Sequence, residues 1–191
     1  MKFFTFWSIL MKHVMIKCLA LAVLGSALGC NKAEEAPASP LTYSFQLLNE
    51  QGQEATVFPK GQNILFRFLL INPTNEVVVL NNPAFDEAEF LAVTRLTPGE
   101  GSGTVGKPYK NMFCEYVQAF RVPPHDTLEL SISWVEAPNS TTRGPFCAHA
   151  PTTWLPVGRY RTSFPIALTL LRGEKTTVTA AQTFSKEFDV K

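Results

Sequence analysis

Apolar and polar residues alternate with a period of two, rather than 3.6, along most of the chain after Leu41. The clearest alternation lies between residues 127 and 134, where one face holds only apolar side chains: Leu128, Leu130, Ile132 and Trp134. A period of two is typical of strands, because successive side chains point to opposite faces. By the same criterion, or from short apolar or β-branched runs, we expect further strands over 41–47, 64–71, 76–80, 90–96, 160–168, 176–183 and 184–190.

The segments between these runs are rich in Pro, Gly and Asn, and no convincing helical pattern occurs. At most a turn or two is expected over 86–92. Seven to nine short strands in about 150 residues predict an all-β chain that forms one antiparallel β-sandwich over residues 41–191. The 15 Phe residues of the chain supply large side chains for its interior. Pro165, within a predicted strand, indicates an edge or a bulge.

Residues 1–29 have the organisation of a cleaved signal peptide. The apolar run from Cys18 to Gly29 follows Lys12, His13 and Lys17 and is about a dozen residues long. A membrane-spanning helix needs roughly 20 such residues, so the run is too short to serve as one. Translation from Met11 instead of Met1 would give a signal of more ordinary length.

Ala27-Leu28-Gly29-Cys30 resembles the lipobox of bacterial lipoproteins, although Leu is more usual three residues before the Cys than two. The resemblance implies a diacylglycerol on the Cys30 thiol, cleavage before Cys30 and a further acyl chain, such as palmitate, on the new amine. Two hydrophobic signals suffice for stable anchoring, so the partner of this end would be a membrane. The alternative is that Cys30 is an ordinary residue near a plain cleavage site.

Residues 30–40 combine the lipidated Cys with small, charged and Pro residues, which predicts a flexible tether. Asn31 stands where many lipoproteins retained at the inner membrane have Asp, which favours the outer membrane. The charged run 32–35 resembles the signal that sends some lipoproteins to the cell surface, and a solvated linker explains it equally well. The expected location is the bacterial cell envelope, with a periplasmic or surface-exposed domain.

Charge argues against a nucleic-acid partner. The chain has 17 Lys and Arg against 16 Asp and Glu. Three of the basic residues lie before Cys30, so the chain from Cys30 onward is slightly acidic and has no basic stripe to face a phosphate backbone.

Two short motifs resemble bacterial immunoglobulin-like domains. One is Phe58-Pro59-Lys60-Gly61-Gln62 before a strand that ends at Asn72-Pro73-Thr74-Asn75; the other is Leu155-Pro156-Val157-Gly158-Arg159-Tyr160. The same combination occurs in the intracellular proteinase inhibitor family of bacilli and its extracytoplasmic relatives. The resemblance covers residues 58–171, with an insertion over 99–124, and it implies an immunoglobulin-like fold. It carries over no inhibitory residue.

Two cysteines remain between Cys30 and the C-terminus, Cys114 and Cys147. Export to an oxidising compartment predicts a disulfide between them. Such a bridge would join residues 33 positions apart and stabilise the fold by roughly 3–4 kcal/mol.

Met112, Cys114, Cys147 and His149 allow a different hypothesis, because they are soft ligands of the kind that select Cu(I). Cys147-Ala148-His149 resembles part of a cupredoxin site, but no Met follows Cys147. A disulfide and a thiolate site exclude each other, and we expect neither a metal nor any other cofactor.

No catalytic constellation is visible. The chain lacks a Gly-x-Ser-x-Gly motif, and the Gly-rich run 99–107 ends in Gly106-Lys107-Pro108 without a following helix. We therefore interpret 99–107 as a flexible hairpin loop and expect a protein that is not an enzyme.

Aromatic residues in and beside the two cysteine-bearing loops are the remaining indication of function. They are Tyr109, Phe113, Tyr116, Phe146 and Trp154. Loops on a rigid sandwich commonly carry binding sites, and aromatics are enriched at interfaces. The alternative is that these side chains fill a minor core beneath the loops.

The sequence therefore predicts a lipid-anchored, non-enzymatic binding or scaffolding module, with an envelope protein as a possible partner. One alternative is a proteinase inhibitor that uses Gly99–Pro108 or Pro138–Pro145 as bait. A copper-handling envelope protein is the other alternative.

Overall fold

The computed structural model describes residues 36–81, 89–96, 103–112, 119–136 and 146–191. The chain divides into two units, Met1–Glu35 and Ala36–Lys191, and the described residues belong to the second. All regular structure in these residues is β. Within the same ranges, no helix has the length and apolar character needed to cross a membrane.

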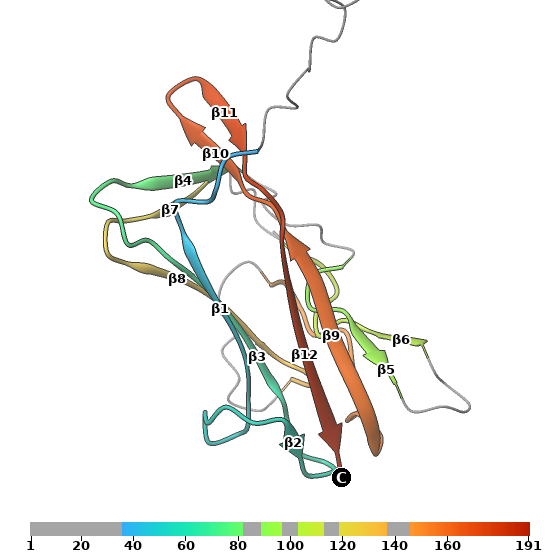
Figure 1. Cartoon of the computed structure of the whole chain (residues 1–191). Coiled ribbons are helices and arrows are strands. Elements are labelled where there is room, and N and C mark those ends of the chain that lie inside the picture. The colour runs from blue at the N-terminus through green and yellow to red at the C-terminus, as the bar shows by residue number, and fades with distance from the viewer. Residues whose placement is uncertain (1–35, 82–88, 97–102, 113–118, 137–145) are drawn as a thin grey trace, which may run out of the picture. The chain divides into compact units, whose positions relative to one another are not determined.

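The strands form three sheets (Figure 1). The first sheet has three antiparallel strands, in the order β1 (Thr42–Leu48), β3 (Leu65–Ile71) and β8 (Thr127–Ser133). The second has the order β2 (Val57–Phe58), β12 (Gln182–Val190), β9 (Gly158–Ile166), β5 (Val93–Arg95) and β6 (Gly103–Gly106). The third has the order β11 (Lys175–Val178), β10 (Thr169–Arg172), β4 (Val78–Asn81) and β7 (Ala119–Val122).

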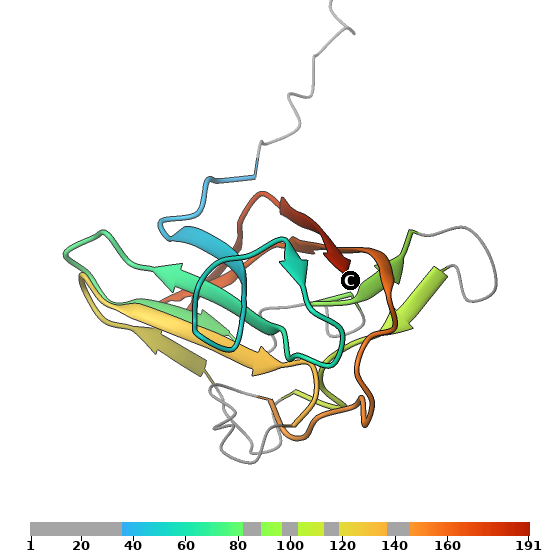
Figure 2. The ribbon, with the colours of Figure 1, turned by 90° about the horizontal axis from the view of Figure 1, so that it is seen from below.

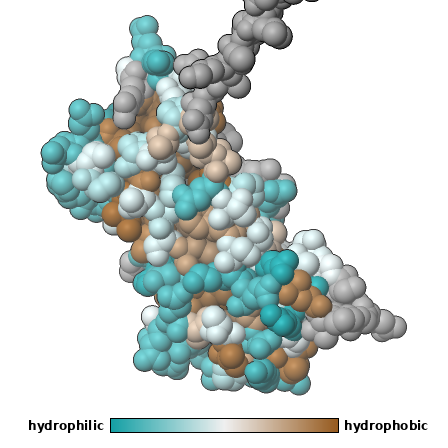
Figure 3. All heavy atoms as spheres, in the orientation of Figure 1, coloured by the Kyte–Doolittle hydropathy of each residue, from teal (hydrophilic) through white to brown (hydrophobic). Residues whose placement is uncertain are grey.

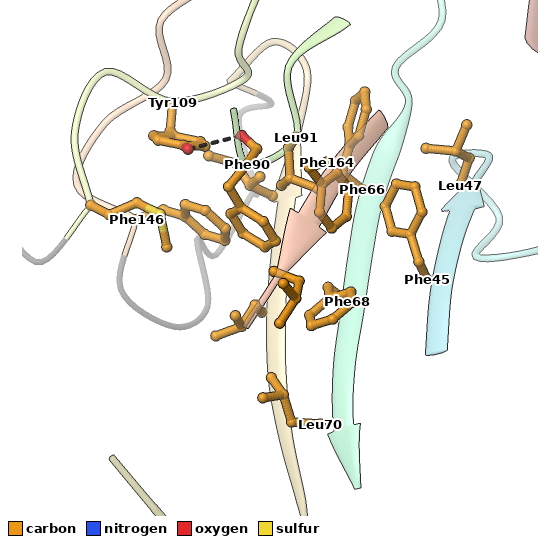
Figure 4. Close-up of a cluster of buried hydrophobic side chains, with 14 of the residues drawn as sticks. Phe45, Leu47, Phe66, Phe68, Leu70, Phe90, Leu91, Tyr109, Phe146 and Phe164 are labelled. Carbon is orange, nitrogen blue, oxygen red and sulfur yellow. Dashed lines mark hydrogen bonds between the residues drawn. The ribbon is translucent and has the colours of Figure 1, made fainter. Parts of the chain in front are cut away.

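The first sheet and the β9–β12 pair of the second lie in two layers (Figure 2), and aromatic side chains pack between these layers (Figure 4). Phe68 of β3 lies with its ring centroid 5.8 Å from that of Phe164 on β9 and 5.1 Å from that of Phe184 on β12. Phe45 of β1 lies 4.9 Å from the same Phe164 ring. The alternation along β3 explains this layer, because Phe66, Phe68 and Leu70 are all fully buried on one face.

The sheets are connected because paired strands continue from one into the next. The β9–β12 hairpin continues as β10–β11, and two hydrogen bonds between Leu168 and Thr179 hold the bend. The Thr179 N–H donates to the Leu168 carbonyl, and the Leu168 N–H donates to the Thr179 hydroxyl. In the same way β3 continues into β4 at Asn72. The long β9–β12 pair therefore has one end at the third sheet and the other at the C-terminus (Figure 1).

The prediction of an all-β chain is confirmed, and its two packed layers are consistent with a β-sandwich. The predicted number of strands is wrong, because the described residues alone hold twelve. Several of the additional strands, such as β2, β6 and β7, have only two to four residues, too few to show a period of two. β2 pairs with β12 in parallel, so the second sheet is mixed rather than purely antiparallel.

Two local predictions also change. Part of the Gly-rich run 99–107, expected to be a flexible loop, forms strand β6, which pairs with β5. The terminal strands are divided differently from the expected 176–183 and 184–190, since the connection 179–181 separates β11 from a nine-residue β12.

Candidate functional site

Two segments that the sequence places in separate loops lie side by side as a short antiparallel ladder. Tyr109 pairs with His149, and Met112 pairs with Phe146. Three backbone hydrogen bonds join the segments: Lys110 N–H to Ala148 O, Cys147 N–H to Asn111 O and Ala150 N–H to Pro108 O, at 2.8, 3.0 and 3.1 Å. The predicted clustering of the two loops is therefore present in the described residues.

Two of the aromatic residues proposed for binding are buried rather than presented to a partner. Tyr109 is 1% exposed and Phe146 is 5% exposed. Figure 4 shows them packed beside Phe90, with the Tyr109 hydroxyl donating to the Phe90 carbonyl at 2.9 Å. The Phe146 ring stacks on that of Phe90 at 6.3 Å. These two side chains therefore extend the core beneath the ladder, as the alternative interpretation expected.

Trp154 is the candidate that remains at the surface, with 42% of the residue exposed. It lines a shallow groove of about 350 Å³, together with Val105, Lys107, Thr152 and Pro156. The floor includes Trp134, which is buried and donates its indole N–H to the carbonyl of Thr153 at 3.2 Å. The buried indole of Trp134 therefore fixes the segment that carries the exposed indole of Trp154.

The opposite wall of this groove depends on the β5–β6 hairpin. Gly106 has a φ of 139°, a conformation that favours glycine, and it brings the chain from β6 to Lys107. The Lys107 ammonium lies 4.7 Å from the centroid of the Tyr109 ring. The groove therefore combines an exposed indole, hydroxyl groups and one cation, which suits a ligand with both apolar and polar groups.

The structure also brings together Ser133 and His149, a pair that no motif in the sequence indicates. Ser133 Oγ lies 3.1 Å from His149 Nε2 and donates to the carbonyl of Val135 at 2.9 Å. Burial lowers the pKa of His149, and the negative charge of Glu136 opposes that shift. Ser133 is only 8% exposed and its proton is directed at a carbonyl, so this geometry does not present an activated nucleophile.

Cys147 is disulfide-bonded, and its partner lies outside the described residues. Of the other copper-ligand candidates, Met112 is buried and His149 contacts Ser133. In the described part of the chain, no three His, Cys, Asp or Glu side chains converge as they would around a metal ion. A sulfur in a disulfide is not a thiolate ligand, which disfavours the copper hypothesis.

Several predicted features lie outside the described residues. They are the signal segment 1–29, Cys30 and the first part of the tether, Phe113, Cys114, Tyr116 and the Pro138–Pro145 loop. The last part of the tether is described from Ala36, and it contacts the domain: the Pro37 carbonyl accepts from the Ala180 N–H at 3.0 Å.

Comparison with family models, with curated proteins and with solved structures finds no match for this chain.

Proposed function

We propose that this chain is a lipid-anchored protein of the bacterial envelope whose domain is a non-enzymatic binding module. The anchor is Cys30, and residues 1–29 are the signal peptide removed during export. The support is the lipobox-like sequence Ala27-Leu28-Gly29-Cys30 after a short apolar run. The domain is an immunoglobulin-like sandwich closed by a Cys114–Cys147 disulfide, and it lies at the outer membrane.

The groove beside Trp154 is the place where this module binds its partner. The observation that carries this assignment is the exposure of Trp154, 42%, although the large side chains beside it, Leu155 in the chain and Trp134 in the groove, are buried. Exposed indoles in grooves are frequent centres of binding energy, because they bury a large area with few rotatable bonds. Lys107 and Thr152 supply polar contacts at the same groove.

The absence of catalysis is part of the proposal. Ser133 and His149 form the pair of described residues that most resembles a nucleophile and its base, yet the serine proton is directed at Val135 O. Turnover that is lost when His149 is replaced would overturn this part of the proposal.

The experiment places a photo-crosslinking phenylalanine derivative at position 154 of the full-length chain in its own host, followed by mass spectrometry of the adducts. The matched control carries the same group at Val57, which is 49% exposed on β2. We expect a discrete adduct from position 154 and none of that mass from position 57. Identical adducts from both positions, or none from position 154, would overturn the assignment of the groove.

The adduct also separates the alternative functions. A protease as the adduct, together with inhibition of that protease by the purified protein, would favour the inhibitor hypothesis. Loss of acyl-chain incorporation in Cys30→Ser tests the anchor independently of the groove, because the substitution lies outside the folded domain.

A further inference from the structure

One face of the third sheet is apolar and open. The register places Leu171 opposite both Val79 and Thr176, and Val178 opposite Thr169. Directly opposed residues share a face, as do residues two apart on one strand, so Val77, Val79, Leu171 and Val178 lie on the same side. The other side of the sheet holds the buried residues Val78, Leu80, Val122 and Leu170.

The open side of the third sheet exposes aliphatic side chains to solvent. Val77 is 49% exposed and Val178 is 54% exposed, and Val79 and Leu171 are half-buried. A groove of about 250 Å³ lies between these strands, lined by Val77, Val79, Leu171 and also by Pro40. Figure 3 shows apolar groups among hydrophilic ones at the end that carries β4, β10 and β11.

The N-terminal segment reaches the domain at this same end (Figure 1). Pro37 is held by its hydrogen bond to Ala180, in the connection between β11 and β12. Ser39 Oγ accepts from the Leu41 N–H at 3.1 Å and from the Tyr43 hydroxyl at 2.6 Å. These contacts fix the point from which the preceding chain departs.

The length of that preceding chain limits where an anchor on Cys30 can be. Seven residue steps separate Cys30 from Pro37, which span at most about 25 Å when fully extended. The nine-residue strand β9 is about 30 Å long, and the third sheet follows its C-terminal end. A lipid on Cys30 is therefore restricted to the neighbourhood of the third sheet and cannot reach the far end of β9.

We propose that the open face of the third sheet, with Val77, Val79, Leu171 and Val178, lies against the surface of the bilayer. This inference rests on the proposed lipidation of Cys30. Exposed aliphatic side chains at an interface gain from partial burial, and Arg121, which is exposed and lies opposite Val79 on the same face, can contact anionic headgroups. The segment 150–156, which holds Trp154, precedes the start of β9, so it lies at the end of β9 that is farther from the third sheet.

The test uses the full lipidated chain in vesicles of phosphatidylethanolamine and phosphatidylglycerol, some carrying a doxyl quencher on an acyl chain. A fluorophore is attached at Thr176→Cys, on the open face, or at Lys60→Cys, whose backbone N–H bonds to Lys191 O at the far end of β12. We expect the doxyl lipid to quench the label at position 176 several-fold more than the label at position 60. Mass spectrometry of the acylated N-terminus confirms lipidation in each sample.

A pair of variants tests the contact itself. The double variant V77S/V178S should reduce quenching at position 176, whereas V57S, a change at a valine of equal exposure on β2, should not. Equal quenching at positions 176 and 60 in a lipidated sample would overturn the membrane contact and leave the anchor intact. Shielding of position 176 from a water-soluble quencher without quenching by lipid would also overturn it, because a protein would then cover the face. A sample without acyl chains on Cys30 would refute the proposed anchor and the membrane contact together.

Discussion

At the scale of single residues, two buried polar side chains have opposite effects on stability, because one is hydrogen-bonded and the other is not. Asn63 is 6% exposed, and both polar atoms of its side-chain amide are hydrogen-bonded. Nδ2 donates to Val135 O at 2.6 Å, and Oδ1 accepts from the Val135 N–H at 3.0 Å. Thr162 is fully buried on β9, and its hydroxyl has no hydrogen-bond partner among the described residues. A buried hydroxyl without a partner costs free energy, because its bonds to water are lost and not replaced.

Replacement of Thr162 by Val should therefore stabilise the fold. The two side chains have nearly the same shape, so the change removes the unpaired hydroxyl without opening a cavity. We expect the free energy of unfolding in urea to rise by about 1 kcal/mol. Thr183→Val, at an exposed position of β12, is the control and should change it by less than about 0.5 kcal/mol. A loss of stability in Thr162→Val would show that the hydroxyl is satisfied.

His149 should make stability depend on pH. Its pKa is lowered in the folded chain, chiefly by burial, so the folded state prefers the neutral ring. The unfolded chain takes up a proton as pH falls through about 6.5, while the folded chain does so only at lower pH. The stability that the fold gains from keeping the His149 ring neutral is therefore fully present above about pH 6.5 and is lost as the pH falls below that value.

Urea unfolding between about pH 8 and about pH 5 measures this effect. We expect His149→Gln to flatten the decline on the acid side. The same slope in His149→Gln and the unsubstituted chain would assign the pH dependence to other groups.

At the scale of strands, the sequence predicts the long elements and misses several of the short ones. β3, β8 and β9 have seven to nine residues, enough for alternation to distinguish a buried face. β2 and β6 have two and four residues, and only their pairing with β12 and β5 makes them strands. Pro165 illustrates a correct local inference: β5 pairs with β9 only at 160–162, so at Pro165 the strand has a described neighbour on one side alone.

The corner between β3 and β4 depends on one amide. Asn72 is fully buried, and its Nδ2 lies 2.8–2.9 Å from the carbonyls of Glu76, Val122 and Pro123. Its backbone N–H also donates to Asp126 O at 2.9 Å. The sequence indicates a turn here, but it does not show that this turn also binds the connection between β7 and β8.

Asn72→Ala should therefore destabilise two connections at once. It leaves buried carbonyls without donors, so we expect a loss of about 2–3 kcal/mol in the free energy of unfolding. Gln51→Ala, at an exposed turn position between β1 and β2, is the control and should cost less than about 0.5 kcal/mol. Hydrogen exchange would localise the effect to the backbone amides of β4 and β7, and uniform loss of protection would argue against a local corner.

At the scale of the whole domain, the candidate site is only partly predictable. The sequence predicts that the segments around Tyr109 and Phe146 belong together, because both surround cysteines and aromatics. It does not reveal that these two rings are buried and Trp154 is not, since burial depends on which strands lie beneath a loop. The contact between Ser133 and His149 likewise results from tertiary packing, and no local sequence pattern indicates it.

The disulfide at Cys147 is a covalent constraint between distant parts of the chain, and we expect its removal to lower the stability of the whole domain. Cys147 is disulfide-bonded and lies within the ladder that joins 108–112 to 146–150, and Asn111, its hydrogen-bond partner, is three residues before Cys114. If Cys114 is the other half, reduction should lower the free energy of unfolding by roughly 3–4 kcal/mol, the loop-closure contribution of a bridge of this length. Cys114→Ser, Cys147→Ser and the double variant should then lose equal amounts, because each removes the same covalent constraint. A stable Cys114→Ser beside a destabilised Cys147→Ser would assign the bridge to another cysteine, and the two loops would then be held by the ladder and the buried aromatic rings alone.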